Sequence, residues 1–559
     1  MVRRASSQLR RLSRVAARYT PADSAAKLDL LGSLSAAALA TPAEVAKLHE
    51  ILCRLRAYPD NPAILRQVVR MLAGFARRKD LRRHRAELAD SGIAGTDTRF
   101  RFFAATAEWL ESRWPEALHL DWGRLKNRER IESFLPLLVH FAETPGLDEW
   151  DLGLEEWLRR LKGRAPTRAA FLVRRLAALR ADAFVREKVY DDIDLPLRLA
   201  ASPGTPSRSH AYLPGSPVVF VRREIPRARP RLPEDLLTAP RAVRSVGPAR
   251  ANRIIELARA AMVARQRDLD LFCYASPRDV RMVVWDEGLR FACLGAMPSR
   301  RLLLEAVYAF LTLKNGVPVG YVLVSALFGS SEIAYNVFET YRGMEAGPIY
   351  GKVLATARHL FGSDAFTIFP YQLGHENEEA IRSGAWWFYQ KIGFRPRRGE
   401  AVRLMRRELA RMRRRPAHRS SPATLRALAE HNLYYFLGEP RREVIGADFL
   451  PNLGLKVSDY LAARFGSDRE EAETICTREA MRLAGLSDLR GWAAGERLAW
   501  TRWAPLVCLL PQVARWGSAD RRALVEVIRA KGGRRESDFV RRFDAHARLR
   551  AALIRLARG

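Results

Sequence analysis

The stretch Ser331–Gly347, SEIAYNVFETYRGMEAG, decides the fold of this chain. Apolar residues alternate with small or polar residues up to Val337, which predicts a β-strand with two distinct faces. The strand pattern runs into a glycine-containing turn, after which apolar residues recur at helical spacing. Free N–H groups and the helix dipole at such a turn favour an anion, and a pyrophosphate fits this description.

The neighbouring segments extend the same pattern. Val307–Lys314 and Val317–Phe328 are β-rich runs joined by Asn315-Gly316, a dipeptide typical of a two-residue hairpin. Ala365–Pro370 predicts a further strand. Glu378–Ile392 predicts one helix, which ends at a glycine before a last extended segment.

Two motifs follow each other in this region, VFETYRGMEAG at Val337–Gly347 and AWWFYQKIGF at Ala385–Phe394. Together they resemble the GNAT superfamily of acyl-CoA N-acyltransferases, whose strand-turn-helix motif is V-x-P-x-Y-R-G-x-G-x-G and whose later helix ends in Y-x-K-x-G-F. The resemblance covers residues 300–400 only. The matching positions are Val337, Tyr341, Arg342, Gly343, Gly347, Tyr389, Lys391, Gly393 and Phe394.

The resemblance implies an acyl-CoA-dependent N-acyltransferase. Such an enzyme moves an acetyl or longer acyl group from acetyl-CoA or another acyl-CoA to an amine acceptor, and it needs no metal. The turn would hold the pyrophosphate of the CoA. The residues expected to bind the CoA are Val337, Arg342, Gly343, Met344, Glu345, Ala346 and Gly347.

Acyl transfer needs a base for the amine, a donor for the developing oxyanion and an acid for the leaving thiolate. The resemblance makes Glu332 the first choice of base and Glu339 the second, with Tyr389 as the acid. The backbone N–H of Val337 is the candidate oxyanion donor. A structural role stays open for Glu332 as a solvent-facing strand residue and for Tyr389 as a packing aromatic.

Glu345 stands where the family has its first loop glycine, and Glu339 replaces the usual proline. A carboxylate near a pyrophosphate repels it. This departure motivates an alternative hypothesis, a catalytically inactive GNAT-like protein that binds a ligand or a partner.

Three further features of the region suggest structural roles. His375-Glu376-Asn377 precedes the last helix and is interpreted as a capping loop, because a second set of metal ligands is missing. Trp386 and Trp387 are candidates for an acyl pocket or, alternatively, for core packing.

The charge of the chain supports a second alternative. The sequence has 559 residues, 95 of them Lys or Arg and 62 Asp or Glu, for a net charge of +33. This excess, carried mostly by arginine, is expected to attract polyanions weakly and nonspecifically. It is either a nucleic-acid-binding surface, as in a nucleic-acid-associated basic protein, or a compositional bias spread over solvated faces.

The five cysteines form no CxxC pair, which favours a reducing compartment. No stretch of about 18 apolar residues is present, so no membrane span is expected. The amino terminus lacks the apolar region of a secretory signal. A cytoplasmic location is the simplest prediction.

The sequence predicts an α+β fold, with a GNAT-like mixed sheet and flanking helices between an all-α N-terminal region and an all-α C-terminal region. The expected divisions are a basic tail (1–23), a helical domain (24–200), a Pro/Arg-rich linker or arm (201–250), a GNAT-like acyltransferase domain (251–410) and a C-terminal helical domain (421–559).

Overall fold

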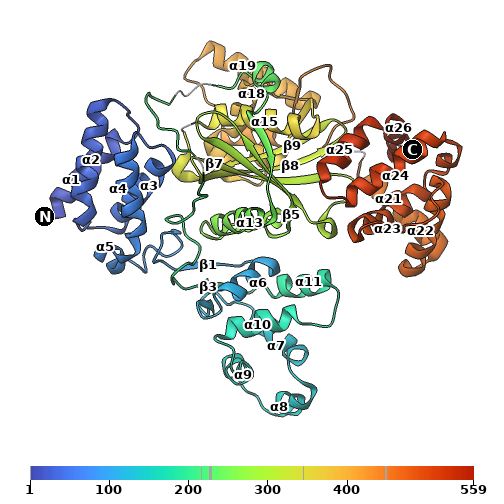
Figure 1. Ribbon diagram of the computed structural model, residues 1–559, viewed down its shortest axis with the longest axis horizontal. Coiled ribbons are helices and arrows are strands. Elements are labelled where there is room, and N and C mark those ends of the chain that lie inside the picture. Colours follow the sequence, from blue (N-terminus) through green and yellow to red (C-terminus); the bar gives the residue numbers. More distant parts are fainter. Residues whose placement is uncertain (1, 216, 226–228, 344, 447–449, 559) are drawn as a thin grey trace. The chain divides into compact units, whose positions relative to one another are not determined.

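The chain divides into two units in the computed structural model, which describes residues 2–215, 217–225, 229–343, 345–446 and 450–558. It is a mixed α+β protein, as the sequence predicts (Figure 1). The first unit comprises Met1–Ile225, Arg253–Cys273 and Lys314–Pro318, and the second comprises Pro226–Asn252, Tyr274–Leu313 and Val319–Gly559.

The first unit is mainly helical. Its helices are α1 (Val2–Val15), α2 (Pro21–Ala36), α3 (Pro42–Ala57), α4 (Pro62–Ala73), α5 (Lys79–Arg83), α6 (Ala104–Arg113), α7 (Arg128–Leu138), α8 (Thr144–Glu149), α9 (Leu154–Leu161), α10 (Arg168–Ala177), α11 (Ala183–Ile193) and α14 (Asp270–Cys273); α13 (Pro248–Val263) has residues in both units. Thr41 and Asn61 cap α3 and α4 through their side chains, and a proline follows each cap, where its missing N–H costs nothing.

Two parts of the first unit differ from the sequence expectation. The basic segment 1–23 contains helix α1, because Ala5, Leu9 and Leu12 form an apolar stripe that is buried in a core cluster. The prediction of an all-α N-terminal region is wrong. Strands β1 (Thr98–Phe100), β2 (Leu118–Leu120) and β3 (Leu197–Leu199) form an antiparallel sheet in the order β1-β3-β2. Three-residue strands are too short to show a two-residue period.

The second unit is built on a nine-stranded sheet in the order β11-β12-β10-β9-β8-β7-β6-β5-β4. Its strands are β4 (Ala242–Ser245), β5 (Ala275–Val284), β6 (Leu289–Ala296), β7 (Ala306–Lys314), β8 (Val317–Leu327), β9 (Ser330–Val337), β10 (Ala365–Ile368), β11 (Arg395–Pro396) and β12 (Leu433–Phe436). The hairpin between β7 and β8 is confirmed: Asn315 and Gly316 both have positive φ, 49° and 80°, as a type I′ turn requires.

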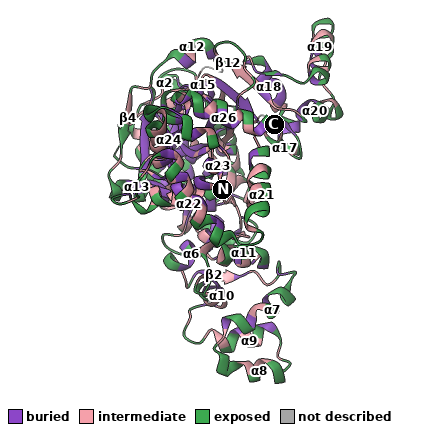
Figure 2. Cartoon of the chain, turned by 90° about the vertical axis from the view of Figure 1, so that its right-hand side faces the viewer, coloured by how far each residue is buried: buried purple, intermediate pink, exposed green. Residues whose placement is uncertain are grey.

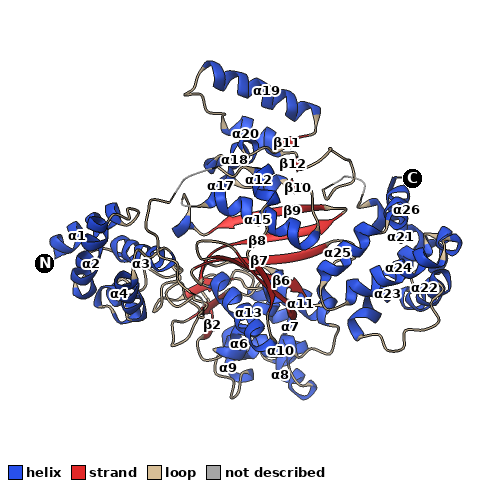
Figure 3. Cartoon of the chain, turned by 45° about the horizontal axis from the view of Figure 1, so that its top comes forward, coloured by secondary structure: helices blue, strands red, loops and turns tan. Residues whose placement is uncertain are grey.

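The second unit also contains helices that pack on this sheet or on one another. They are α12 (Leu232–Leu237), α15 (Ala346–Phe361), α16 (Pro370–Leu373), α17 (Glu378–Ser383), α18 (Ala385–Lys391), α19 (Gly399–Arg414), α20 (Pro422–Ala429), α21 (Asn452–Phe465), α22 (Arg469–Ala484), α23 (Ala494–Cys508), α24 (Ser518–Gly532), α25 (Glu536–Ala545) and α26 (Ala547–Arg558). Figure 3 shows α21–α26 grouped beside the sheet. The strands are largely buried, whereas α19 is largely exposed (Figure 2).

Several elements of the second unit correct the sequence expectation. The region 421–559 is not all-α, since it supplies β12, which pairs with β10 and β11. The linker or arm 201–250 carries α12 and β4, and β4 pairs antiparallel with β5. The single helix predicted at Glu378–Ile392 is two helices, because Gly384 has a left-handed φ of 66° that interrupts it. Among the described residues, no helix is long and apolar enough to span a membrane.

A buried ionic cluster joins α24 and α25 to the sheet. The Nζ of Lys531 lies 2.6 Å from Oε1 of Glu536, and both side chains are at most 3% exposed. Lys531 also donates to the carbonyl oxygen of Glu305 at 2.7 Å, immediately before β7. Nε of Arg301 lies 3.9 Å from Oε2 of Glu536 and is also buried. Because none of these charges is solvated, Glu536 depends on its two cationic neighbours for its stability.

We predict that Lys531→Ala destabilises the second unit by ~3–5 kcal/mol, because it leaves the Glu536 carboxylate buried beside an empty space. Urea unfolding followed by tryptophan fluorescence measures the effect as a lower midpoint. Arg482→Ala, at a side chain that is 76% exposed, is the control and should change the midpoint little. Equal midpoints for the two variants would contradict the role of the cluster.

Candidate functional site

Strand β9 has a parallel neighbour along only part of its length. β10 pairs with Ser330, Ser331 and Glu332, whereas β8 pairs with β9 as far as Val337. The C-terminal half of β9, residues 333–337, therefore extends past its pairing with β10, and Ala334–Val337 are only half-buried. We call this half of β9, on the side of β10, the open edge.

The backbone donors on the open edge can be assigned from the hydrogen bonds of the opposite edge. The N–H of Phe338 donates to the carbonyl oxygen of Val319 on β8 at 3.0 Å. Peptide groups alternate in direction along a strand, so the N–H groups of Ile333, Tyr335 and Val337 point away from β8. The carbonyl oxygen of Val337 also points away from β8, since it accepts a hydrogen bond from Nε of Arg342 at 3.3 Å. The pairing of Glu332 with Thr367 uses the N–H of Ile333. The open edge thus presents the N–H groups of Tyr335 and Val337 as backbone donors.

The predicted turn lies directly after the open edge. A short 3₁₀ helix, Glu339–Tyr341, leads to Gly343, whose φ of 76° is left-handed, and Glu345 precedes α15 as its N-cap without a side-chain cap bond. Met344, expected to bind CoA, lies outside the described residues. Ala346 and Gly347 form the first turn of α15, where backbone N–H groups have no partner within the helix. The structure therefore has a helix N-terminus at the predicted place.

Glu345 places a carboxylate in the interior beside this turn. Its residue is 8% exposed. The pKa of the Tyr335 phenol is raised by burial first, then by Tyr389 and by the negative charge of Glu345. The hydroxyl of Tyr335 donates to the carbonyl oxygen of Ala346 at 3.2 Å. Glu345 therefore adds negative charge close to the N-terminus of α15.

Glu332, the first candidate base, has a raised pKa. Burial raises its pKa to about 7, and repulsion from Glu305 adds to the rise. Glu305 itself has a raised pKa, again because it is buried. A carboxyl with a pKa near 7 can both accept and release a proton at neutral pH. Glu332 is thus well suited to act as a general base, and Glu305 is a residue that the sequence analysis missed.

Tyr389, the candidate acid, lies on the other face of β9. It is 4% exposed, its ring centroid is 5.6 Å from that of Tyr350 on α15, and Tyr350 in turn contacts Tyr335 on β9. Burial raises the pKa of Tyr389, so the phenol keeps its proton at neutral pH. Successive strand residues face opposite sides, which puts Glu332 and Tyr335 on different faces. Glu332 and Tyr389 can meet one substrate only if it lies in the plane of the sheet, along the open edge.

Other predicted residues do not join this arrangement. Glu339 is exposed in the 3₁₀ helix. Arg342 is exposed and forms an ion pair with Glu379, with Nη1 and Oε1 2.5 Å apart. Its guanidinium is therefore already shared with a carboxylate.

The three features assigned structural roles can also be placed. Asn377 caps α17 by accepting from the N–H of Ala380 at 3.2 Å, as interpreted from the sequence. Trp386 and Trp387 are buried, and their indole N–H groups donate to Leu428 and Ser420. In the part of the chain that the structure describes, no group of His, Cys, Asp and Glu is placed to hold a metal ion.

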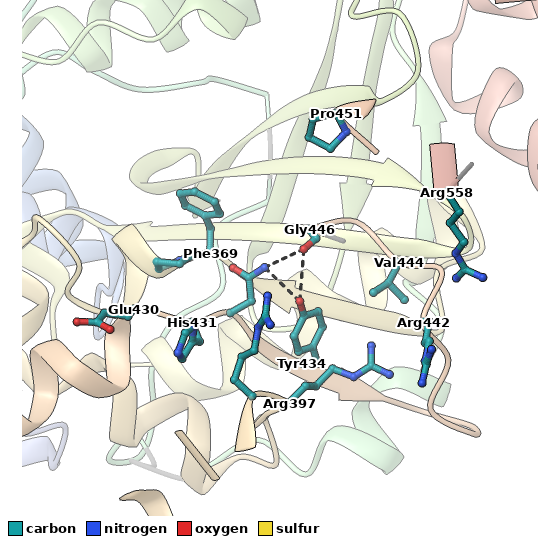
Figure 4. Close-up of a pocket in the computed structure, with 13 residues that line it drawn as sticks. Phe369, Arg397, Glu430, His431, Tyr434, Arg442, Val444, Gly446, Pro451 and Arg558 are labelled. Carbon is teal, nitrogen blue, oxygen red and sulfur yellow. Dashed lines mark hydrogen bonds between the residues drawn. The ribbon is translucent and has the colours of Figure 1, made fainter. Parts of the chain in front are cut away.

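A separate cavity of about 750 Å³ lies where β10 and β11 end and β12 begins (Figure 4). We call it the arginine cavity. It is lined by Phe369, Pro370, Arg397, Arg398, Glu430, His431, Asn432, Tyr434, Arg442, Val444, Gly446, Pro451 and Arg558. The sequence shows Arg397 and Arg398 within a basic run, but it carries no signal that Arg442 and Arg558 join them.

Comparison with known proteins finds no matching family model, no matching curated protein and no matching solved structure. The site is therefore interpreted from its own geometry and chemistry.

We predict that the acidity of Glu332 makes stability depend on pH. A carboxyl whose pKa rises from 4.5 when unfolded to about 7 when folded holds its proton more tightly in the folded state. The contribution of Glu332 to the free energy of unfolding therefore falls as pH rises from about 4.5 to 7. Glu332→Gln lacks this loss, so at pH 8 it should be more stable than the unmodified protein, by roughly 3 kcal/mol at most.

Urea unfolding at pH 5 and pH 8 measures this difference. Glu339→Gln is the control, because it removes the same charge from an exposed position. If Glu332→Gln and Glu339→Gln respond to pH in the same way, the carboxyl of Glu332 does not have the raised pKa.

Proposed function

We propose that the second unit is an acyl-CoA-dependent N-acyltransferase with a GNAT-like fold, transferring an acetyl or longer acyl group to an amine. The observation that carries the proposal is the open edge of β9, which starts after Glu332 and is followed by the turn that leads to the N-terminus of α15. An extended ligand with a pyrophosphate at one end and a reactive thioester at the other matches this arrangement.

The sheet supports the same proposal. α15 connects β9 to β10, which run parallel to each other, and β12 then pairs antiparallel with both β10 and β11. Ligands of such sheets bind beyond the carboxyl ends of the parallel strands. In this unit that position is the open edge and the turn that follows it.

The chemistry assigns one role to each group. Glu332 accepts a proton from the attacking amine, whose nitrogen forms a bond to the thioester carbonyl carbon. The N–H of Val337 donates a hydrogen bond to the developing oxyanion. As the carbon–sulfur bond breaks, Tyr389 donates its proton to the leaving sulfur, giving an amide and a free thiol. Ala346 and Gly347 offer backbone N–H groups to the pyrophosphate.

One observation favours a second candidate, an inactive GNAT-like protein that binds a different ligand or a partner. Glu345 holds a negative charge beside the N-terminus of α15, where the proposed pyrophosphate also lies. The two negative charges repel each other, so Glu345 weakens CoA binding by an amount that depends on the separation of the charges and on their access to water.

Isothermal titration with acetyl-CoA and with longer acyl-CoAs tests the proposal. We predict that the unmodified protein binds at least one of them with a Kd below about 1 mM. Glu345→Gln keeps the shape of the side chain and removes its charge, so it should tighten binding by about tenfold, ~1.4 kcal/mol. Glu339→Gln, on the neighbouring 3₁₀ helix, is the matched control and should have a smaller effect because the side chain is exposed.

If neither the unmodified protein nor Glu345→Gln binds any acyl-CoA at millimolar concentration, the enzyme hypothesis fails and the inactive alternative is favoured. Binding that is unchanged in Glu345→Gln would show that the carboxylate does not face the pyrophosphate.

A further inference from the structure

The arginine cavity is brought together by the pairing of three strands. Pro396 of β11 pairs with Leu433 of β12, and Leu433 pairs with Ile368 of β10. Three chain segments therefore meet at one end of these strands: the two that follow β10 and β11, and the one that precedes β12. Residues 442–446 and the end of α26 complete the wall, so the cavity is a product of the fold of the second unit.

Its lining is strongly basic. Four arginines, Arg397, Arg398, Arg442 and Arg558, line the cavity together with a single carboxylate, Glu430. Other acidic residues reach two members of the lining: Glu443 pairs with Arg558 at 2.7 Å, and Glu400 contacts His431 at 2.8 Å. In Figure 4, Arg442 and Arg558 lie on the opposite side of the opening from Glu430 and His431. An anion in the cavity would relieve the repulsion among the guanidinium groups.

Arg397 is held in place by aromatic rings. Its guanidinium carbon lies 5.2 Å from the ring centroid of Tyr434 and 5.1 Å from that of Phe436. Asn432 fixes this platform by donating to the hydroxyl of Tyr434 at 3.2 Å and to the carbonyl oxygen of Gly446 at 3.2 Å. Stacking uses the face of the guanidinium, so its in-plane N–H donors stay available for the two oxygens of a phosphate or carboxylate.

We propose that the arginine cavity is a binding site for a compact polyanionic small molecule that carries phosphate or carboxylate groups. Its volume of about 750 Å³ is that of a small-molecule site. The proposal is independent of acyl transfer, because it uses none of the residues of the open edge. The arginines at the end of α19 differ from these four, because they line no part of this cavity.

Isothermal titration of the full chain at low salt tests the proposal, with pyrophosphate and with citrate as probes. Arg397→Gln/Arg442→Gln removes two cavity charges at exposed positions, and Arg413→Gln/Arg414→Gln removes the same charge from α19. We expect the unmodified protein to bind at least one probe with a Kd below about 1 mM, and the cavity variant to bind it about tenfold more weakly. The α19 variant should bind within about twofold of the unmodified protein.

The comparison of probes identifies the ligand class: tighter binding of pyrophosphate supports a phosphate ester, and tighter binding of citrate supports a polycarboxylate. Binding of the probe should persist in saturating acetyl-CoA. Displacement by acetyl-CoA would overturn the proposal of a separate site. The proposal is also overturned if neither probe binds, or if both double variants weaken binding equally. Loss of acetyl-CoA binding alone would contradict only the acyltransferase proposal.

Discussion

The partial pairing of β9 with β10 is the constraint on which the account of the second unit depends. β9 is fully paired with β8, so its position in the sheet is fixed, but it keeps a parallel partner only at Ser330–Glu332. Strong backbone donors and acceptors need partners. The N–H groups of Tyr335 and Val337 are therefore both rigidly held and directed at a place where an extended ligand can complete the hydrogen bonding.

Electrostatics divides the acidic groups of this unit into two kinds. Glu536 is buried but is compensated by Lys531 at 2.6 Å, which makes it a structural charge. Glu332 is half-buried, and its pKa rises to about 7 because desolvation and the neighbouring carboxyl of Glu305 both disfavour its charged form. A carboxylate in such surroundings does not stabilise the fold, which makes Glu332 a candidate for proton transfer.

The sequence predicts the centre of the sheet well because the local signals there are strong. The Asn315-Gly316 dipeptide identifies the hairpin, and the alternation up to Val337 identifies β9 and its two faces. The four-residue strand β12 escapes prediction, since a short run in a helical region carries little periodicity. The helix break at Gly384 also escapes prediction, because a glycine inside a helical pattern does not reveal its φ.

The site is less predictable than the fold, because it is made by contacts between distant segments. Glu332 could be proposed from its place on a strand, but its pKa depends on desolvation by the packed structure and then on Glu305, which precedes another strand. The arginine cavity joins Arg397 to Arg442 and Arg558, and no local pattern relates these residues.

Hydrogen exchange of individual backbone amides, with and without acetyl-CoA, tests the central claim most directly. We expect the N–H groups of Tyr335 and Val337 to become protected when acetyl-CoA is added, since they gain hydrogen-bond acceptors. The N–H of Phe338, already bonded to Val319, should change little. Unchanged exchange at both amides, with acetyl-CoA present at saturation, would contradict the proposed role of the open edge.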